Sequence, residues 1–265
     1  MKTPRTPSFL PTEHQLLQNK DFLVLLIRLF LGYIFFSAGV CKLTGGNFGQ
    51  LIGPPWLIEA LAKHQLGFFA QVVAGSQVVC GLLLFTQRLS TLGAVMLVPM
   101  NLSILAVTIS QNWTGTPYVN AVFLLLNLLL LAYEHQKFTF LFSTAPPQPV
   151  SAPRLDPLKT GVLPWLVLVA GLLTMAVAPF HLLATQVLGM LTFTLTAALL
   201  LNSKVLRGLE KVMISLAVVN MVLVTLGMKS DVAPKMVVAV SGVLLLLLLA
   251  NFWLQTRRNK AMVLG

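Results

Sequence analysis

The sequence has few charged residues, and acidic ones are the scarcest. Only 9% of its 265 residues are charged, with 7 Asp or Glu against 18 Lys or Arg, while 57% are hydrophobic. A soluble domain is about 25% charged and about 45–50% apolar. This composition, with a mean hydropathy of +0.86, excludes an ordinary soluble enzyme and predicts an integral membrane protein.

Residues that carry chemistry are also scarce. The two cysteines, Cys41 and Cys80, do not form a CxxC motif, and at their different depths in two helices we expect buried, unbonded thiols. There is no HExxH motif, glycine-rich phosphate loop or nucleophile elbow. We therefore predict no metal site and no self-sufficient catalytic centre. Any redox chemistry would come from a bound cofactor or a partner chain.

The apolar residues are gathered into long runs that predict an all-α polytopic membrane protein. We expect four transmembrane helices before a proline-rich stretch and about four after it. The runs span residues 21–44, 66–85, 90–110, 119–133, 162–180, 184–201, 209–228 and 232–254. Near residues 179–185 a single bent or re-entrant element is the alternative to two separate helices.

The proline-rich stretch gives the one clear boundary in the chain. Residues 137–160 contain the sequence APPQPVSAPRLDP, which predicts an extended linker. The predicted organisation is a tail (1–21), a four-helix membrane bundle (22–136), the linker (137–160) and a four-span module with a basic tail (161–265). A duplication of the first half is an open alternative, although the halves have no convincing residue-level match.

The net charge of +11 reflects membrane topology. With the N-terminus inside, thirteen Lys and Arg residues fall in inner segments and four in outer ones. This predicts a multi-pass protein of the bacterial cytoplasmic (inner) membrane with both termini cytoplasmic. Because the basic residues separate apolar runs, we expect the lipid bilayer as a partner and no nucleic acid.

Arg28 lies inside the first apolar run. A guanidinium in hydrocarbon costs roughly 2.5–3.5 kcal/mol, so it should point into the bundle. Depths along antiparallel helices place Gln77, Asn101 and Asn127 near its level, with Glu134 as the nearby carboxylate. We predict a buried polar cluster of these five residues, in which Arg28 is held either by Glu134 or by the amide oxygens of the other three. It either lines a pocket for a lipid headgroup, a quinone carbonyl or a protein partner, or joins the helices by hydrogen bonds.

The opposite end of the predicted bundle has its own polar and aromatic residues. Lys42 ends the first run, and Trp113 and Tyr118 flank the turn before the fourth. Aromatic side chains favour the membrane interface. We predict that these three residues lie at the mouth of the pocket.

Three short motifs resemble those of one membrane protein family. The first is R-x3-G-x3-F-x2-G-x2-K, formed by Arg28, Gly32, Phe36, Gly39 and Lys42. The others are Gly75, Gly81 and Arg88, spaced G-x5-G-x6-R, and the lead-in Trp113-Thr-Gly-Thr-Pro117. Over residues 22–136 the chain resembles the DoxX-like (DoxX/DoxD) integral membrane proteins.

The resemblance implies a four-helix membrane bundle associated with redox or thiol-handling partners. The family name comes from a subunit of a quinone-linked thiosulfate oxidoreductase. On this basis we expect an accessory or quinone-contacting subunit of a membrane redox system, with a quinone as candidate cofactor. The second helix of such proteins often carries an acid where this chain has Gln77. A small-molecule or lipid transporter and a structural subunit of a larger complex are the alternatives.

Overall fold

All the secondary structure that the computed structural model describes is helical. The model describes residues 11–141, 155–227 and 232–264. The elements are α1 (Pro11–Leu43), α2 (Leu57–Ala62), α3 (Gly67–Phe85), α4 (Ser90–Ser110), α5 (Thr116–Tyr133), η1 (His135–Leu141), η2 (Asp156–Lys159), α6 (Leu163–Val177), α7 (Leu182–Leu201), α8 (Gly208–Gly227) and α9 (Ala233–Leu264). The prediction of an all-α polytopic membrane protein is confirmed.

Seven of the described helices are long and apolar enough to cross a membrane. The remaining predicted span, residues 162–180, contains helix α6, which has only 15 residues. Its length is about 22 Å, compared with roughly 30 Å for the hydrocarbon layer. It is short because Pro164 stands in its first turn and the chain turns again before Pro179. Helices α6 and α7 pack as separate antiparallel helices, so residues 179–185 do not form a single bent element.

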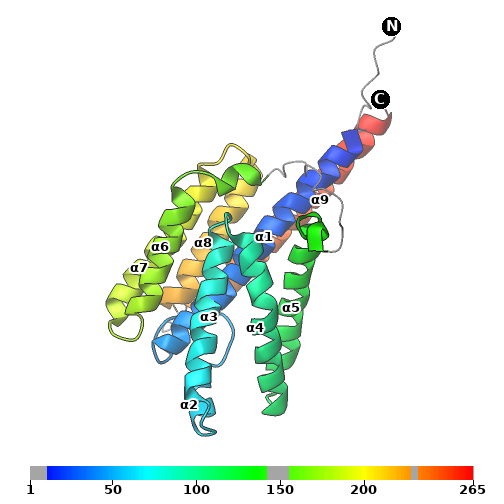
Figure 1. Cartoon of the computed structure of the whole chain (residues 1–265). Helices are drawn as coiled ribbons and strands as arrows, with labels where there is room; N and C mark the ends of the chain where they lie inside the picture. The colour runs from blue at the N-terminus through cyan, green and yellow to red at the C-terminus, as the bar shows by residue number, and fades with distance from the viewer. Residues whose placement is uncertain (1–10, 142–154, 228–231, 265) are drawn as a thin grey trace.

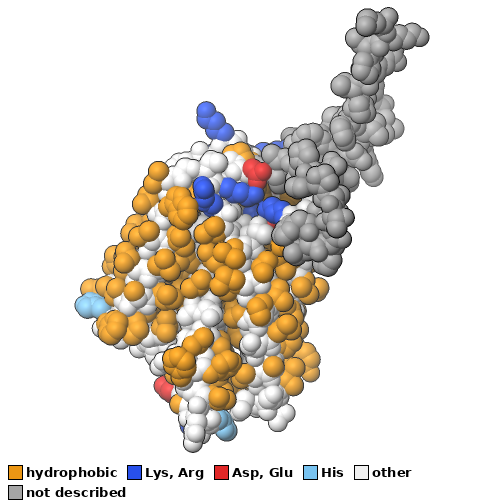
Figure 2. All heavy atoms as spheres, in the orientation of Figure 1, with side chains coloured by type: hydrophobic (Ala, Val, Ile, Leu, Met, Phe, Trp, Pro, Cys, Tyr) orange, Lys and Arg blue, Asp and Glu red, His pale blue; other side chains and the backbone are white. Residues whose placement is uncertain are grey.

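The two ends of the bundle differ in charge. In Figure 1, α1 begins and α9 ends at the same end of the bundle, which we call the terminal end; the other is the distal end. Figure 2 shows a mostly hydrophobic surface along the helices, with Lys and Arg side chains gathered toward the terminal end of this face. Arg88, Lys159 and Lys204 belong to connections at that end. The cytoplasmic assignment of this end stays a prediction.

Helix α1 is the centre of the packing. Within its candidate span 78% of the most apolar window is buried, compared with 6% for α9. A methyl group on Gly39 would lie 2.5 Å from the Ala74 carbonyl oxygen, and one on Gly81 would lie 2.4 Å from the Phe36 nitrogen. Only glycine fits at these positions, so the crossing of α1 and α3 depends on them.

The helices after the proline-rich stretch share this core. The Phe193 ring of α7 packs edge-on against Tyr33, Phe36 and Phe85, with ring centroids 5.6, 5.7 and 6.0 Å away. Helix α6 also packs on α3. The two predicted helical groups therefore contact each other directly. Of the predicted linker, residues 142–154 lie outside the described residues.

We expect Gly81→Ala to destabilise the protein by about 2 kcal/mol, because the added methyl overpacks the contact between α1 and α3. Gly75→Ala is the matched control on the same helix, since a methyl group there meets no atom within 4 Å. Alanine also has the higher helix propensity, so the control should unfold at the wild-type temperature or slightly above. Thermal unfolding in mild detergent measures both variants, and equal midpoints would contradict this account of the crossing.

Candidate functional site

Arg28 of α1 forms a buried ion pair with Glu134, which follows α5. Nη2 of Arg28 donates to Oε1 of Glu134, and Nη1 donates to Oε1 of Gln87 at 3.3 Å. The second carboxylate oxygen accepts from the Thr91 hydroxyl and, at 2.9 Å, from Nζ of Lys137. These five residues, which we call the terminal ion-pair cluster, join α1, α4 and α5.

The neighbours of Glu134 stabilise the ionised form of its carboxyl group. Burial alone would raise the pKa of Glu134, but the hydrogen bond from Thr91 and the charges of Arg28 and Lys137 outweigh it and lower the pKa below its ordinary value. Arg28 and Glu134 are only 3% and 8% exposed. The pair is thus satisfied by protein groups, and it lines neither of the two cavities described below.

All five residues of the predicted polar cluster are buried, but they do not form a single hydrogen-bonded group around Arg28. Arg28 and Glu134 are together as predicted, but Gln77, Asn101 and Asn127 make no hydrogen bond to Arg28 among the described side chains. Side chains on a helix point back toward its N-terminus. Because α1 and α3 run in opposite directions (Figure 1), Arg28 reaches the terminal end and Gln77 the distal end.

The side chains of Asn127 and Asn120 on α5 donate to backbone carbonyl oxygens of α4. Nδ2 of Asn127 donates to the backbone carbonyl oxygen of Ala94 at 2.9 Å. Nδ2 of Asn120 donates to the backbone carbonyl oxygen of Asn101 at 2.8 Å. The side chain of Asn101 itself is buried with neither polar atom paired among the described residues. These are contacts that hold helices together.

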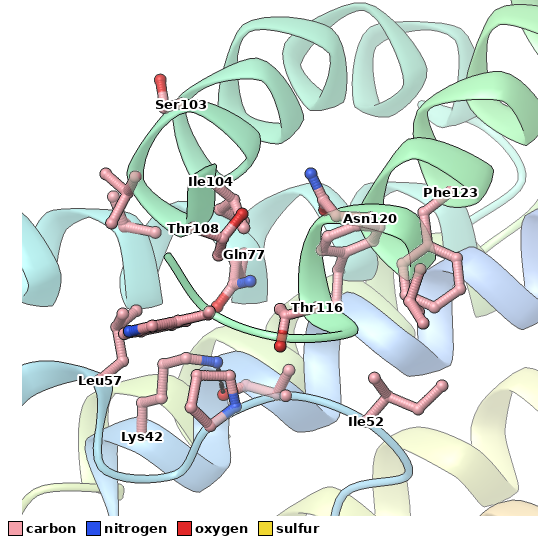
Figure 3. Close-up of a pocket in the computed structure, with 18 of the residues that line it drawn as sticks. Lys42, Ile52, Leu57, Gln77, Ser103, Ile104, Thr108, Thr116, Asn120 and Phe123 are labelled. Atoms are coloured by element: carbon pink, nitrogen blue, oxygen red, sulfur yellow. Dashed lines mark hydrogen bonds between the residues drawn. The ribbon is translucent and has the colours of Figure 1, made fainter. Parts of the chain in front are cut away.

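A second polar site lies near the distal end, in a pocket between α1, α3, α4 and α5. The empty space of this pocket, counted together with the open solvent at its mouth, is about 650 Å³. Its wall is mostly apolar, and α2 with the loop before it closes one side. Figure 3 shows Lys42, Gln77 and Thr108 around the same space, with Ile52 and Phe123 at one side of it. We call this the distal pocket.

Lys42 is the charged group of the distal pocket. It is 4% exposed, and its Nζ donates to the Ala38 carbonyl oxygen at 3.0 Å. The described residues give it no ion pair. Since helical side chains point toward the N-terminus of their helix, Lys42 at the distal end of α1 is directed back into the bundle rather than out toward water. Opposite it, Oε1 of Gln77 is buried without a partner.

Two of the three residues predicted at a pocket mouth line the distal pocket, which does not contain Arg28. Lys42 and Trp113 line the distal pocket, and Trp113 packs edge-on against Trp56 with ring centroids 4.9 Å apart. Tyr118 is 79% exposed and does not line it. On α5 the pocket face carries Thr116, Val119, Asn120 and Phe123, spaced by three and four residues, and residue 118 falls on another side of the helix.

Several residues of both sites were missed from the sequence. Gln87, Thr91 and Lys137 join the terminal ion-pair cluster, and Asn120 and Thr108 line the distal pocket. A signal existed for the first three, because Gln87 and Lys137 follow apolar runs and Thr91 lies at the start of one at the end where Glu134 lies. No group of three or more His, Cys, Asp or Glu residues that could hold a metal occurs within the described ranges. Cys41 and Cys80 are buried free thiols, as predicted.

Comparison with known proteins gives one match. Residues 23–110 match the family model described as DoxX, which covers α3, α4 and the membrane part of α1 and lies within the predicted segment of 22–136. Helix α5, with Asn120 and Asn127, and all later helices lie beyond it. Neither the comparison with curated proteins nor that with solved structures gave a match.

We expect Glu134→Gln to destabilise the protein by about 3–5 kcal/mol, because it leaves the Arg28 charge buried without its carboxylate. The double variant Arg28→Met with Glu134→Gln should recover part of this loss. Glu59→Gln, at an exposed carboxylate of α2, is the control and should unfold like wild type. Thermal unfolding in detergent is measured for both single variants, the double variant and the control, and additive effects of Arg28→Met and Glu134→Gln would contradict a coupled pair.

The stabilisation by Glu134 should decrease at acidic pH. A carboxyl whose pKa is lowered on folding stabilises the folded state above its unfolded pKa of about 4.3 and loses that contribution as pH falls through the folded value. The difference in unfolding midpoint between wild type and Glu134→Gln should therefore be constant near neutral pH and shrink below about pH 4.3. A difference that grew on acidification would contradict the lowered pKa.

Proposed function

The chain is a membrane protein with a DoxX domain in residues 23–110, and on this basis we propose that it is a quinone-contacting accessory subunit of a membrane redox system. We further propose that the quinone head enters the distal pocket rather than the terminal ion-pair cluster. The cluster has its charges satisfied by protein groups, while the pocket has space and contains the ammonium of Lys42 and the Gln77 amide, whose Oε1 has no partner among the described residues.

The observation that carries this proposal is the ammonium of Lys42 inside an apolar pocket. An ammonium has three donors, and the described contacts use one of them, on Ala38. A buried cation of this kind favours a ligand that brings an acceptor oxygen. The carbonyl oxygens of a quinone are such acceptors, and the Gln77 amide offers a further donor on the opposite wall.

The rest of the pocket wall suits a flat apolar ring. Phe35, Trp113 and Phe123 line it together with aliphatic side chains, and aromatic pairs favour offset-stacked or edge-on arrangements. A quinone would supply the electron-accepting chemistry when bound. The chain would bind and orient the quinone through Lys42 and Gln77, and a partner protein would supply the electrons.

A possible two-part organisation of the chain and prolines within its apolar runs favour the alternative of a transporter. Helix α4 continues through Pro99, Pro164 stands in the first turn of α6, and Pro179 lies in the turn after it. None of the three divides a described helix into two parts, so the feature that favoured discontinuous transporter helices is lost. A purely structural subunit remains the outcome to expect if no quinone binds.

We expect Lys42→Met to weaken binding of a short-tailed benzoquinone at least about 10-fold, because a hydrogen bond from a charged donor contributes about 1.5–3 kcal/mol. Binding is measured on the purified full-length protein by quenching of the fluorescence of Trp113 and Trp56, in a background with Trp165→Phe and Trp253→Phe.

The matched control is Lys63→Met, an exposed lysine of the loop after α2, which should keep wild-type affinity. Both variants are compared after their thermal unfolding shows that they are folded. Equal affinity of Lys42→Met and wild type, or no quenching by any quinone, would reject the distal pocket as a quinone site.

A further inference from the structure

A second cavity lies on a neighbouring side of α1, between α1, α8 and α9. It encloses about 1000 Å³ of atom-free space, including its open part. Its walls are formed mainly by aliphatic side chains such as Leu26, Ala217 and Leu244. Tyr33 donates to the Met221 carbonyl oxygen at 3.2 Å, so its hydroxyl is already paired. We call this cavity the tail groove.

One amide borders the tail groove. Nδ2 of Asn220 donates to the Ser241 hydroxyl at 2.7 Å, and only Oδ1 of Asn220 has no partner among the described residues of this cavity. The groove is otherwise suited to hydrocarbon. It has no charged residue in its lining, in contrast to the distal pocket with Lys42.

Lining residues of the tail groove and of the distal pocket are neighbours at two places. Leu51 lines the groove, and the next residue, Ile52, lines the pocket. Phe30 lines the groove, and its ring packs edge-on against Phe123 of the pocket with centroids 5.9 Å apart. Phe30, Leu51 and Ile52 are 39%, 42% and 37% exposed, so this junction lies at the surface of the helical bundle.

The tail groove extends along the axis of α1, which is the direction in which the tail of a membrane lipid would lie. Its lining on α1 extends from Tyr33 to Leu23, about 15 Å along the helix axis toward the terminal end. The polar head site is at the distal end and the apolar groove leads from it into the hydrocarbon layer. This is the order of head and tail in an amphiphile that stands along the bilayer normal.

We propose that the tail groove holds the isoprenoid tail of the quinone whose head occupies the distal pocket. This inference rests on the proposed function and assigns a role to α8 and α9, which lie outside the family match. The tail would pass from the pocket across Phe30 and Ile52 and then lie against α8 and α9. Affinity should then increase with tail length until the groove is filled.

The test compares a tailless benzoquinone with one that carries several isoprene units, on the full-length protein in lipid nanodiscs. Wild type should bind the tailed quinone at least about 10-fold more tightly at equal mole fraction in the bilayer, because the tail packs against ordered side chains of the groove in place of mobile lipid chains. Ala217→Phe fills the groove and should remove this gain while leaving the affinity for the tailless quinone unchanged.

Val238→Phe is the matched control, because Val238 lies on α9 but is 73% exposed and does not line the groove. If Ala217→Phe does not fold, Leu244→Trp fills the same groove from α9 and replaces it. A tail that adds no affinity in wild type, or a gain that survives in the folded groove-filling variant, would overturn the tail groove alone. Failure of wild type to bind either quinone would overturn the proposed function together with it.

Discussion

A positive charge inside a membrane protein requires an oxygen partner, and α1 buries two such charges. Arg28 meets the carboxylate of Glu134, and this contact joins α1, α4 and α5 at the terminal end. Lys42 meets only the Ala38 carbonyl oxygen among the described groups. The Glu134 carboxylate therefore gives the terminal end a structural role, because it holds three helices together. The Lys42 ammonium at the distal end has no carboxylate among the described residues and favours a ligand with an acceptor oxygen.

The direction of the helices decides which polar side chains can reach each cation. Side chains lean toward the N-terminus of their helix, so those on α1 point toward the terminal end and those on α3 toward the distal end. Arg28 is thereby carried toward Glu134, and Gln77 is carried away from it into the distal pocket. The same rule turns Lys42 inward, although it stands one residue before the end of α1.

The number and type of helices could be predicted because the apolar runs are long and separated by polar connections. The contact of Arg28 with Glu134 could also be predicted, because few carboxylates were available to it. The grouping of Gln77 and Asn101 with Arg28 was wrong because depth along a helix does not give the direction of the side chain. Tyr118 was misplaced for a similar reason, since its side of α5 depends on which face packs against α1 and α4.

The helices after residue 160 support the loop that closes one side of the distal pocket. The loop between α1 and α2 carries Ile52 of the pocket wall, and it is positioned by α7 and α8. A methyl group on Gly49 would lie 2.2 Å from the Val224 carbonyl oxygen, and one on Gly189 would lie 2.9 Å from the Phe48 ring. Both contacts are as close as glycine allows, so α7 and α8 fix the course of this loop. The first four membrane helices form most of the pocket, and the later helices hold the loop that closes its side.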